Sequence, residues 1–438
     1  MSDVPIDSNA TASVLRRGLG PATGSSTQIF QTPDTQPGKR RTRVAFYSHD
    51  TMGLGHLRRN LLVANALASS PHHAIPLLVA GVREATAFAM PPGTDCLTLP
   101  ALQKSSTGQY EARSLDVSIA DIIALRARII RAALEAFEPD VLIVDNVPRG
   151  ALRELDSTLQ QLRKTGRTRC VLGLRDVIDE PAAVKNEWTR LSNEDAIRDF
   201  YDEVWAYSDP AVYNLVREYR FSEDVASKVR FTGYLDQRAR FGLPGENEAC
   251  PLAAHDLRGS EYVLCTVGGG QDGANLAEAF VQAELPADMA GVILTGPFMP
   301  KDLLSRLQHL ASANPRMRVL EFFGEPAHLM RGAARVIMMG GYNSVCEALS
   351  FEKPMLIAPR IKPRQEQMIR AQALHAMGLA DLLRPEQVSP DALTRWLSQD
   401  RPRPEVHRRV DFNGLSALSA MFDRLASGPT PEMRSGVE

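Results

Sequence analysis

Two hydrophobic patterns alternate along this chain. Short, uniformly apolar runs such as 44–47 and 336–339 have the length and composition of buried strands. Many are followed by segments such as 56–68, in which apolar side chains recur every three to four residues, the period of an amphipathic helix. Strands that alternate with helices predict an α/β protein with parallel sheets covered by helices.

The alternation restarts after 242–248, a stretch rich in glycine and glutamate that predicts a linker. We therefore expect two doubly wound parallel-sheet domains, over residues 41–240 and 250–400, followed by a C-terminal helix at 403–427. A length of 438 residues also favours two domains over a single core. The polar, low-complexity ends, 1–40 and 428–438, are expected to be disordered.

The first candidate site follows the first expected strand, where Gly53 and Gly55 lead into a helix that begins at His56. The positive end of the helix dipole disfavours a protonated imidazole, so His56 could act as a general base toward a hydroxyl group. The alternative is a histidine that only hydrogen-bonds the loop. Asp145 ends another apolar run, where either a site role or a turn role is open.

A second glycine loop, at 268–273, joins an expected strand to an expected helix. Four glycines in six residues let several backbone amides converge on one anion, although a flexible turn is the alternative. A third loop has Gly340 and Gly341 before Asn343 and Ser344, which are favoured residues at a helix N-terminus. Both loops are candidates for binding a phosphate group.

Glu347 has two interpretations. Ser344 and Glu347 have the spacing of a capping box, in which the carboxylate would bond the helix start and touch no ligand. Alternatively, Glu347 binds a ligand hydroxyl. The basic residues Arg360 and Arg364, followed by Glu366 and Gln367, offer donors for phosphate and acceptors for a hydroxyl-rich ring. Unless this segment is an ordinary solvated loop, it predicts a nucleotide sugar as the ligand.

Composition narrows the function classes. A net charge of −2 argues against a nucleic-acid binder that relies on a basic field over the whole protein. The five cysteines lack CxxC spacing, so neither a disulfide framework nor a zinc site is indicated, and a cytoplasmic location is expected. No apolar run approaches the roughly 18 to 20 residues that span a bilayer. Peripheral membrane contact, with Arg126, Arg128 and Arg131 on one helix, stays open.

Three motifs in one order carry a family resemblance: GLGH at 53–56, GGGQDGA at 268–274, and GGYNSVCEAL with PRIKPRQEQ between 340 and 367. Together they resemble the GT-B glycosyltransferases of family 28, whose best-known member adds N-acetylglucosamine to the lipid-linked peptidoglycan precursor. The resemblance implies two Rossmann-like domains that face each other across a cleft. The second domain would hold the donor nucleotide and the first the acceptor.

The resemblance also assigns roles. It implies that Gly268 to Gly270 and Gln271 line the donor diphosphate, that Ser344 and Glu347 contact the ribose side, and that Glu366 and Gln367 face the donor sugar. It places Phe323 where a backbone group contacts the uracil, and it matches His56 to a histidine that acts as a general base or as an oxyanion contact. With the residues argued above, the expected donor site comprises Gly268, Gly269, Gly270, Gln271, Phe323, Gly341, Asn343, Ser344, Glu347, Arg360, Arg364, Glu366 and Gln367, and the acceptor-side loop comprises Gly53, Gly55 and Asp145.

The sequence departs from the family pattern in four places. Asp272 is an extra residue in the second glycine loop, and the first glycine loop has one glycine fewer than the family. Glu366 replaces a glutamine, and Gly233-Tyr234-Leu235 stands where the family has Gly-Asn-Pro. These differences leave the donor sugar and the acceptor open and argue against peptidoglycan synthesis.

The expected activity is transfer of a hexose or N-acetylhexosamine from a nucleoside-diphosphate sugar, with UDP as the favoured nucleotide, to a hydroxyl of a saccharide or lipid-linked acceptor. No cofactor is expected, and the absence of an Asp-x-Asp pair predicts no catalytic metal. One rival is a UDP-sugar 2-epimerase on the same fold, and another is a non-catalytic nucleotide-sugar binder. A dinucleotide oxidoreductase is disfavoured because Arg58 replaces the third glycine of its fingerprint.

Overall fold

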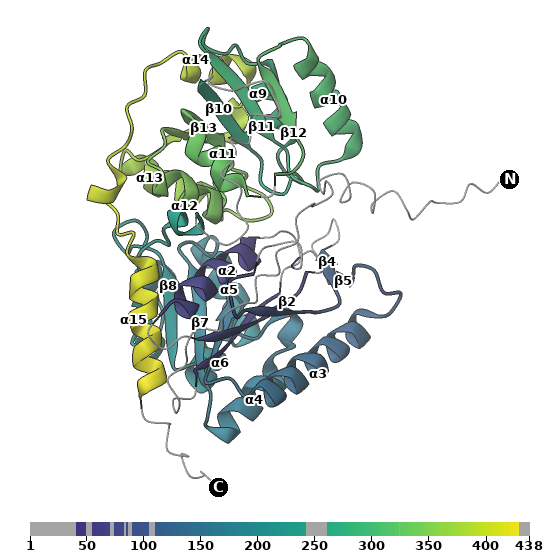
Figure 1. Cartoon of the computed structure of the whole chain (residues 1–438), viewed down its shortest axis with the longest axis vertical. Coiled ribbons are helices and arrows are strands. Elements are labelled where there is room, and N and C mark those ends of the chain that lie inside the picture. Colours follow the sequence, from purple (N-terminus) through teal and green to yellow (C-terminus); the bar gives the residue numbers. More distant parts are fainter. Residues whose placement is uncertain are drawn as a thin grey trace, which may run out of the picture. The chain divides into compact units, whose positions relative to one another are not determined.

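The computed structural model describes residues 41–428 except 50–54, 71–73, 83–84, 86–89, 105–109, 242–260 and 324. Gly53, most of the helix expected at 84–89, the linker at 242–248 and the tails at 1–40 and 429–438 lie outside the described residues. From Arg41 onward the chain belongs to one compact unit, which is built on two parallel β-sheets (Figure 1).

The first sheet has seven parallel strands in the order β3-β2-β1-β6-β7-β8-β9. Its strands are β1 (Arg43–Ser48), β2 (Ile75–Ala80), β3 (Asp95–Thr98), β6 (Val141–Asp145), β7 (Arg169–Arg175), β8 (Glu203–Tyr207) and β9 (Val229–Phe231). Its helices are α2 (Gly55–Ala68), α3 (Ile119–Phe137), α4 (Asp156–Thr165), α5 (Pro181–Leu191), α6 (Asn193–Phe200), α7 (Leu215–Tyr219) and α8 (Glu223–Ala226).

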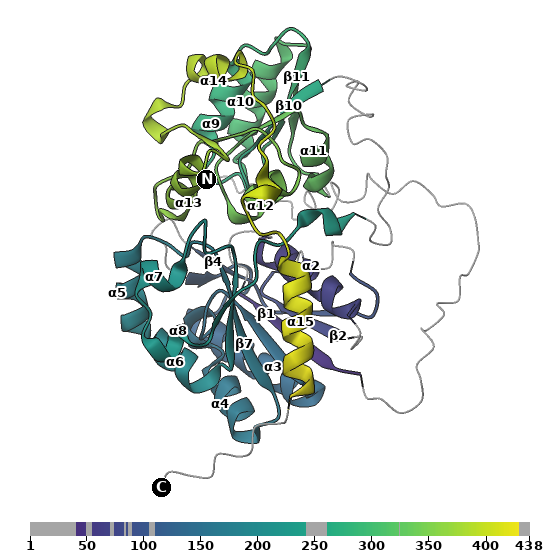
Figure 2. The same ribbon diagram turned by 90° about the vertical axis from the view of Figure 1, so that its left-hand side faces the viewer.

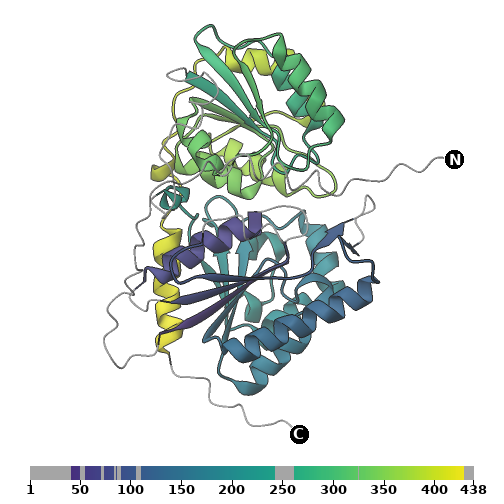
Figure 3. The same ribbon diagram turned by 45° about the vertical axis from the view of Figure 1, so that its right-hand side comes forward.

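Alternate side chains of β1 enter two different cores, as the two-residue period of a strand requires. Val44 and Phe46 pack in the core that includes Leu57 of α2, whereas Ala45 and Tyr47 pack in the core that includes Ile130 of α3. Helices therefore cover both faces of the first sheet, with α2 on the face opposite to α3 and α4 (Figure 3). Burial on both faces explains why the strands are uniformly apolar.

The second sheet has six parallel strands in the order β12-β11-β10-β13-β14-β15. Its strands are β10 (Glu261–Thr266), β11 (Met289–Leu294), β12 (Met317–Leu320), β13 (Arg335–Met338), β14 (Met355–Ile357) and β15 (Asp381–Leu382). Its helices are α9 (Ala274–Gln282), α10 (Lys301–Ser312), α11 (Pro326–Gly332), α12 (Tyr342–Ser350), α13 (Glu366–Ala376) and α14 (Pro390–Leu397). The two sheets confirm the predicted α/β class with doubly wound parallel sheets.

After α14 the chain returns to the first sheet. Its last helix, α15 (Gly414–Ser427), packs beside α2, and both helices contribute to one core through Leu418, Phe422 and Leu57 (Figure 2). The helix expected from residue 403 therefore begins at Gly414. Before it lies a 3₁₀ turn, Val406–Arg408, within a segment that contains Pro402 and Pro404.

Two segments have local structure that their sequence pattern does not reveal. The helical pattern over 187–201 forms two helices, because Ser192 between α5 and α6 has the left-handed φ of 50°. The polar stretch 104–116 contains β5 (Tyr110–Ala112), which pairs antiparallel with β4 (Leu102–Lys104). Arg126 is fully buried against Glu154, with Nε to Oε2 at 2.6 Å, so it cannot belong to a basic surface for membrane contact.

In the part of the chain that is described, no helix is both long and apolar enough to cross a bilayer.

Candidate functional site

Each sheet has one point at which the strand order reverses direction, between β1 and β6 in the first sheet and between β10 and β13 in the second. Loops that leave neighbouring strands in opposite directions open a crevice there, where α/β proteins bind ligands. The loops at these points contain the residues singled out from the sequence. They are the start of α2, Asp145 at the end of β6, the glycine loop after β10 and the start of α12.

A cavity of about 280 Å³ joins the loops of the two sheets. We call it the central cavity. Nine of the predicted site residues line it, namely Gly55, His56, Gly268, Gly269, Phe323, Gly341, Asn343, Ser344 and Glu347. Asn343 also ties the two sheets together, because its side-chain amide donates to the Gly55 carbonyl at 2.8 Å. The loops predicted separately therefore form one site.

The imidazole of His56 is positioned by a contact with the carboxylate of Asp145. The His56 Nδ1 lies 2.8 Å from Asp145 Oδ2, and Arg59 Nη2 donates to both carboxylate oxygens at 2.6 Å. Asp145 is fully buried, whereas 22% of the His56 side chain is exposed. The position of His56 one residue into α2 accounts for this arrangement, because the first turn of α2 faces the end of β6.

The charge of Asp145 determines which nitrogen of His56 carries the proton. Burial alone would raise the pKa of Asp145, but the guanidinium of Arg59 and the imidazole of His56 outweigh burial and hold that pKa well below its usual range. Asp145 is therefore ionised and accepts a hydrogen bond from the protonated Nδ1 of His56. Arg59 Nη2 is also 3.1 Å from Nδ1, but its two shorter bonds go to the carboxylate. Nε2 is then the proton-accepting nitrogen.

The glycine loop after β10 has a backbone that other residues would not adopt easily. Gly268 and Gly270 have φ values of +64° and +95°, in the region that favours glycine. A Cβ on Gly270 would meet the Thr295 carbonyl oxygen at 2.5 Å, whereas a Cβ on Gly268 would meet nothing within 4 Å. Gly268 and Gly269 thus present bare backbone to the cavity, Gly270 packs the loop against the next strand end, and Gln271 is exposed outside the cavity lining.

The start of α12 offers a second set of backbone donors. Its N-cap is Gly341, which has no side chain to bond the first amides, and an added Cβ there would meet nothing within 4 Å. The first amides of a helix have no partner within the helix, so they are available to an anion in the cavity. The capping box between Ser344 and Glu347 is therefore wrong, because both residues lie inside the helix.

Glu347 is buried and forms an ion pair with Arg240, with Oε1 to Nη1 at 3.2 Å. Burial raises the pKa of Glu347, against the opposing effect of Arg240 and Arg58. Arg240 belongs to a 3₁₀ turn, Gln237–Arg240, on the segment that leaves the first sheet. Glu347 thus both pairs with this arginine and lines the central cavity.

The four residues at 360, 364, 366 and 367 are not among those that line the central cavity. Arg360 pairs with Asp272 at 3.2 Å and with Glu366 at 2.9 Å. Arg364 lies 3.8 Å from Asp179 of the first sheet, and Gln367 accepts a hydrogen bond from the backbone amide of Arg360. Both arginines thus face carboxylates of the protein itself.

Three arginines that the sequence did not indicate as site residues also line the cavity, Arg58, Arg59 and Arg175. Arg59 is only 3% exposed, because its side chain contacts the buried Asp145. The helical pattern placed it on a polar face and could not reveal the facing carboxylate. Arg175 ends β7, and its position at a strand end was the available signal.

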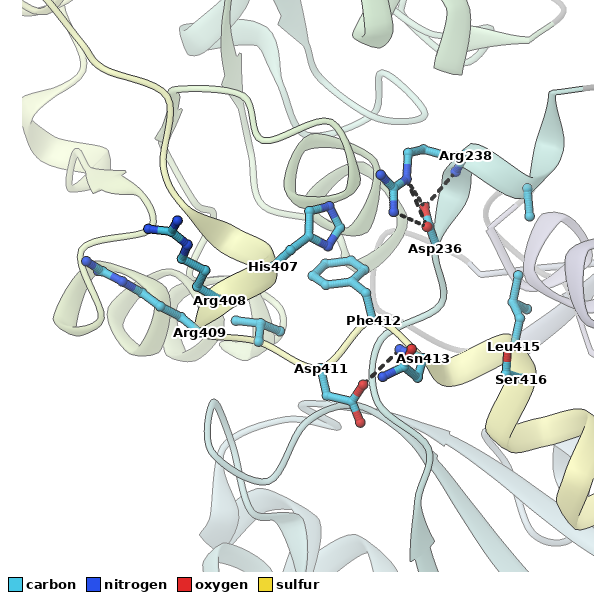
Figure 4. A pocket seen from close by; sticks show the side chains of 12 residues that line it. Asp236, Arg238, His407, Arg408, Arg409, Asp411, Phe412, Asn413, Leu415 and Ser416 are labelled. Carbon is cyan, nitrogen blue, oxygen red and sulfur yellow. Dashed lines mark hydrogen bonds and ion pairs between the residues drawn. The ribbon is translucent and has the colours of Figure 1, made fainter.

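A larger, more open cavity of about 820 Å³ lies where residues 236–239 pass residues 407–416 (Figure 4). Its charged side chains are satisfied within the protein. Arg238 pairs with Asp236 at 2.6 Å, Arg408 pairs with Glu405 at 2.8 Å, and Arg409 donates to the Met377 carbonyl. None of the predicted site residues lines it, so we assign the functional site to the central cavity.

Across the described residues, no three side chains of His, Cys, Asp and Glu are grouped as they would be around a metal ion.

Comparisons with known proteins give one family match. Residues 264–410 match the glycosyltransferase family 28 C-terminal domain. That range contains the glycine loop after β10 and the whole of α12 and α13. No curated protein matches the sequence.

Several solved structures share the fold over most of the chain. CalG4, the calicheamicin glycosyltransferase, is 15% identical, covering 90% of this chain and 100% of that one with a TM-score of 0.56. S. aureus MnaA, solved with UDP, is 13% identical, with coverage of 88% and 96% and a TM-score of 0.58. A protein from Listeria monocytogenes described as a candidate UDP-N-acetylglucosamine 2-epimerase is 14% identical, with coverage of 90% and 99% and a TM-score of 0.60. At these identities the likeness establishes the fold alone, and the family match covers the second sheet. Residues 264–410 thus match the glycosyltransferase family 28 C-terminal domain, within a chain that has the GT-B fold.

Proposed function

We propose that this protein transfers a sugar from a nucleoside-diphosphate donor, with UDP as the favoured nucleotide, to a hydroxyl group of a saccharide or lipid-linked acceptor. One observation carries the proposal. The central cavity contains both a histidine backed by an ionised carboxylate and the two sets of backbone amides suited to a diphosphate. The family 28 match of the second sheet supports the donor assignment.

His56 is the proposed base. The acceptor oxygen forms a bond to the anomeric carbon of the donor sugar while the bond from that carbon to the diphosphate breaks, and its electron pair leaves on the diphosphate. The proton of the acceptor hydroxyl passes to Nε2 of His56. Asp145 keeps Nδ1 protonated and stabilises the imidazolium that forms, because its ionised carboxylate lies 2.8 Å away.

The donor would lie against the second sheet. We assign the amides of Gly268, Gly269 and the first turn of α12 to the diphosphate, whose negative charge grows as the sugar leaves. Glu347 would accept hydrogen bonds from the ribose hydroxyls, and Phe323 would contact the uracil ring of the nucleotide. The proposal needs no cofactor besides the donor.

Glu366 remains the best candidate of its segment for contact with the donor sugar. Its Oε1 is engaged by Arg360 at 2.9 Å, whereas its Oε2 is buried and has no hydrogen-bond partner among the described residues. A buried carboxylate oxygen without a donor is costly, and a sugar hydroxyl would supply one. Arg360 and Arg364 have less capacity left for a phosphate because both face carboxylates.

The test is a comparison of His56→Gln with the wild type in donor binding and turnover. The glutamine can still bond Asp145 but cannot serve as a base at neutral pH, so we expect turnover to fall by about 10²- to 10⁴-fold. The UDP dissociation constant should change little. His375→Gln is the control, because His375 lies on α13 outside the cavity and contacts the Ala380 carbonyl. Undiminished turnover in His56→Gln would remove His56 as the base.

A 2-epimerase is the second candidate function, since one solved structure with the same fold is described as a candidate UDP-N-acetylglucosamine 2-epimerase. Mass spectrometry and NMR of the products separate the possibilities. Transfer yields free UDP and a new glycoside only when an acceptor alcohol is added. Epimerisation changes the sugar stereochemistry with the donor alone. A non-catalytic binder leaves every donor intact while still binding UDP.

A further inference from the structure

Arg175 is the last residue of β7 and lines the central cavity from the side of the first sheet. β7 is the neighbour of β6, whose last residue Asp145 pairs in register with Gly173. Arg175 therefore approaches the site from the carboxyl end of the strand beside the one that ends at Asp145. It shares the cavity with Gly268 and Gly269 of the second sheet.

The charge of Arg175 is poorly satisfied by the protein. Its one hydrogen bond in the described structure runs from Nη2 to the Ile178 carbonyl at 3.3 Å, and its buried Nε has no partner among the described residues. No carboxylate of the described residues forms an ion pair with it. Burial lowers the pKa of Arg175 to about 10. The Glu366 carboxylate, which is not in ion-pair contact with Arg175, opposes this shift, whereas the positive charges of Arg370, Arg364 and Arg59 reinforce it. It still carries a full positive charge at neutral pH.

Five other arginines in or near the site contrast with Arg175, because each of the five has a carboxylate within 4 Å. The pairs are Arg59 with Asp145, Arg240 with Glu347, Arg360 with Glu366, Arg364 with Asp179 and Arg370 with Asp176. A partly buried cation without an anion is unfavourable in the free protein. Such a cation beside bare backbone amides is suited to an anionic ligand, and a guanidinium matches phosphate geometry well.

We propose that Arg175 is the cationic ligand of the donor diphosphate, supplied by the first sheet while the backbone amides come from the second. This inference rests on the proposed function. It also shifts the charge-neutralising role expected of Arg360 and Arg364 to a residue of the other sheet. The diphosphate would then bridge the two sheets, and Arg175 would hold the leaving group on the side where the acceptor approaches.

The alternative is that Arg175 has a structural role, which we call a brace, and stabilises the turn after β7 through its hydrogen bond to the Ile178 carbonyl. The two roles predict opposite effects on the free protein. Removing a brace lowers the melting temperature, whereas removing an uncompensated cation leaves it unchanged or raises it. Ligand affinity separates them further, because a brace has no preference for phosphate.

The experiment is calorimetric titration of the full chain with UDP and with uridine, for the wild type, Arg175→Met and Arg230→Met. Methionine preserves most of the side-chain length without the charge. Arg230 is the matched control, because it lies on β9 of the same sheet, donates to the backbone carbonyls of Ser227 and Val229, and is outside the cavity. We expect Arg175→Met to raise the UDP dissociation constant about 10- to 100-fold. Uridine affinity and the melting temperature should be maintained, and Arg230→Met should behave as the wild type.

Three results would overturn the inference. UDP affinity in Arg175→Met within twofold of the wild type would exclude a phosphate contact. An equal loss of UDP and uridine affinity would assign Arg175 to general support of the site. If the wild type bound neither UDP nor uridine, the proposed function itself would be contradicted. The first two results would leave the proposed function intact. If Arg175→Met does not fold, Arg175→Gln, which can keep the bond to Ile178, gives the same comparison.

Discussion

At the scale of single residues, the proposed catalytic role of His56 depends on the buried contact of Asp145 with Arg59 and His56. We predict that Asp145→Asn lowers the free energy of unfolding by about 3–5 kcal/mol, because Arg59 would be left buried without an anion. The exposed pair of Asp195 with Arg198 provides the control, and Asp195→Asn should cost less than about 1 kcal/mol. Denaturant unfolding at pH 7 measures both. Equal costs would show that the buried cluster contributes little.

The same residue predicts a pH dependence. The pKa of Asp145 is lower in the folded protein than its value of about 3.9 in an unfolded chain. Its contribution to stability is therefore fully present above that value and is lost as the pH falls through the acid range. The wild type should lose more stability than Asp145→Asn between about pH 5 and pH 2. Parallel curves would contradict this assignment.

The sequence identified some of these residues and not others. His56 and Asp145 were predictable because each occupies a position at which parallel sheets bind ligands, the start of a helix and the end of a strand. Arg175 ends a strand, which was the available signal for it. Arg59 was not predictable, because its charge partner, Asp145, lies 86 residues away in the chain. Arg126 was wrongly placed on a surface for the same reason, since Glu154 lies on the segment that follows β6.

At the scale of elements, the proposed phosphate site of the second sheet depends on the open start of α12. Gly341 has φ −60° and ψ 144°, which is an ordinary N-cap conformation for any residue. We predict that Gly341→Asp stabilises the protein by about 0.5–1 kcal/mol, because the carboxylate caps the first amides and meets the positive end of the dipole. UDP affinity should fall more than 10-fold, since the carboxylate would occupy the place of the phosphate.

Gly341→Asn is the matched control for that change. Asparagine caps the helix with nearly the same shape but without the charge, so it should weaken UDP binding much less than aspartate. Thermal unfolding and calorimetric titration give the two quantities. If Asp and Asn had the same effect on UDP affinity, the start of α12 would not face an anion.

Most elements were predictable from local pattern, because a buried parallel strand is a short apolar run whatever its neighbours. The failures were at positions where tertiary contacts decide. The break between α5 and α6 depends on a left-handed Ser192, which the helical period does not reveal. The strand β5 exists through its pairing with β4, and the start of α12 at Tyr342 depends on where the β13 loop ends.

At the scale of the whole molecule, the two sheets are tied by contacts between residues far apart in sequence. Arg370 forms a fully buried pair with Asp176 at 2.6 Å, and the Tyr342 hydroxyl donates to the Tyr207 carbonyl at 2.6 Å. The sequence predicted two doubly wound sheets and, through its family resemblance, a site between them. It could not predict these ties, because their partners are separated by 194 and 135 residues.

The most direct test of the account is a crystal structure of the full chain with UDP bound. We expect the diphosphate to lie in the central cavity, against the amides of Gly268 and Gly269 and the start of α12, with Arg175 at its other side and the ribose next to Glu347. UDP in the larger cavity beside Phe412, or a central cavity left empty at saturating UDP, would contradict the central claim.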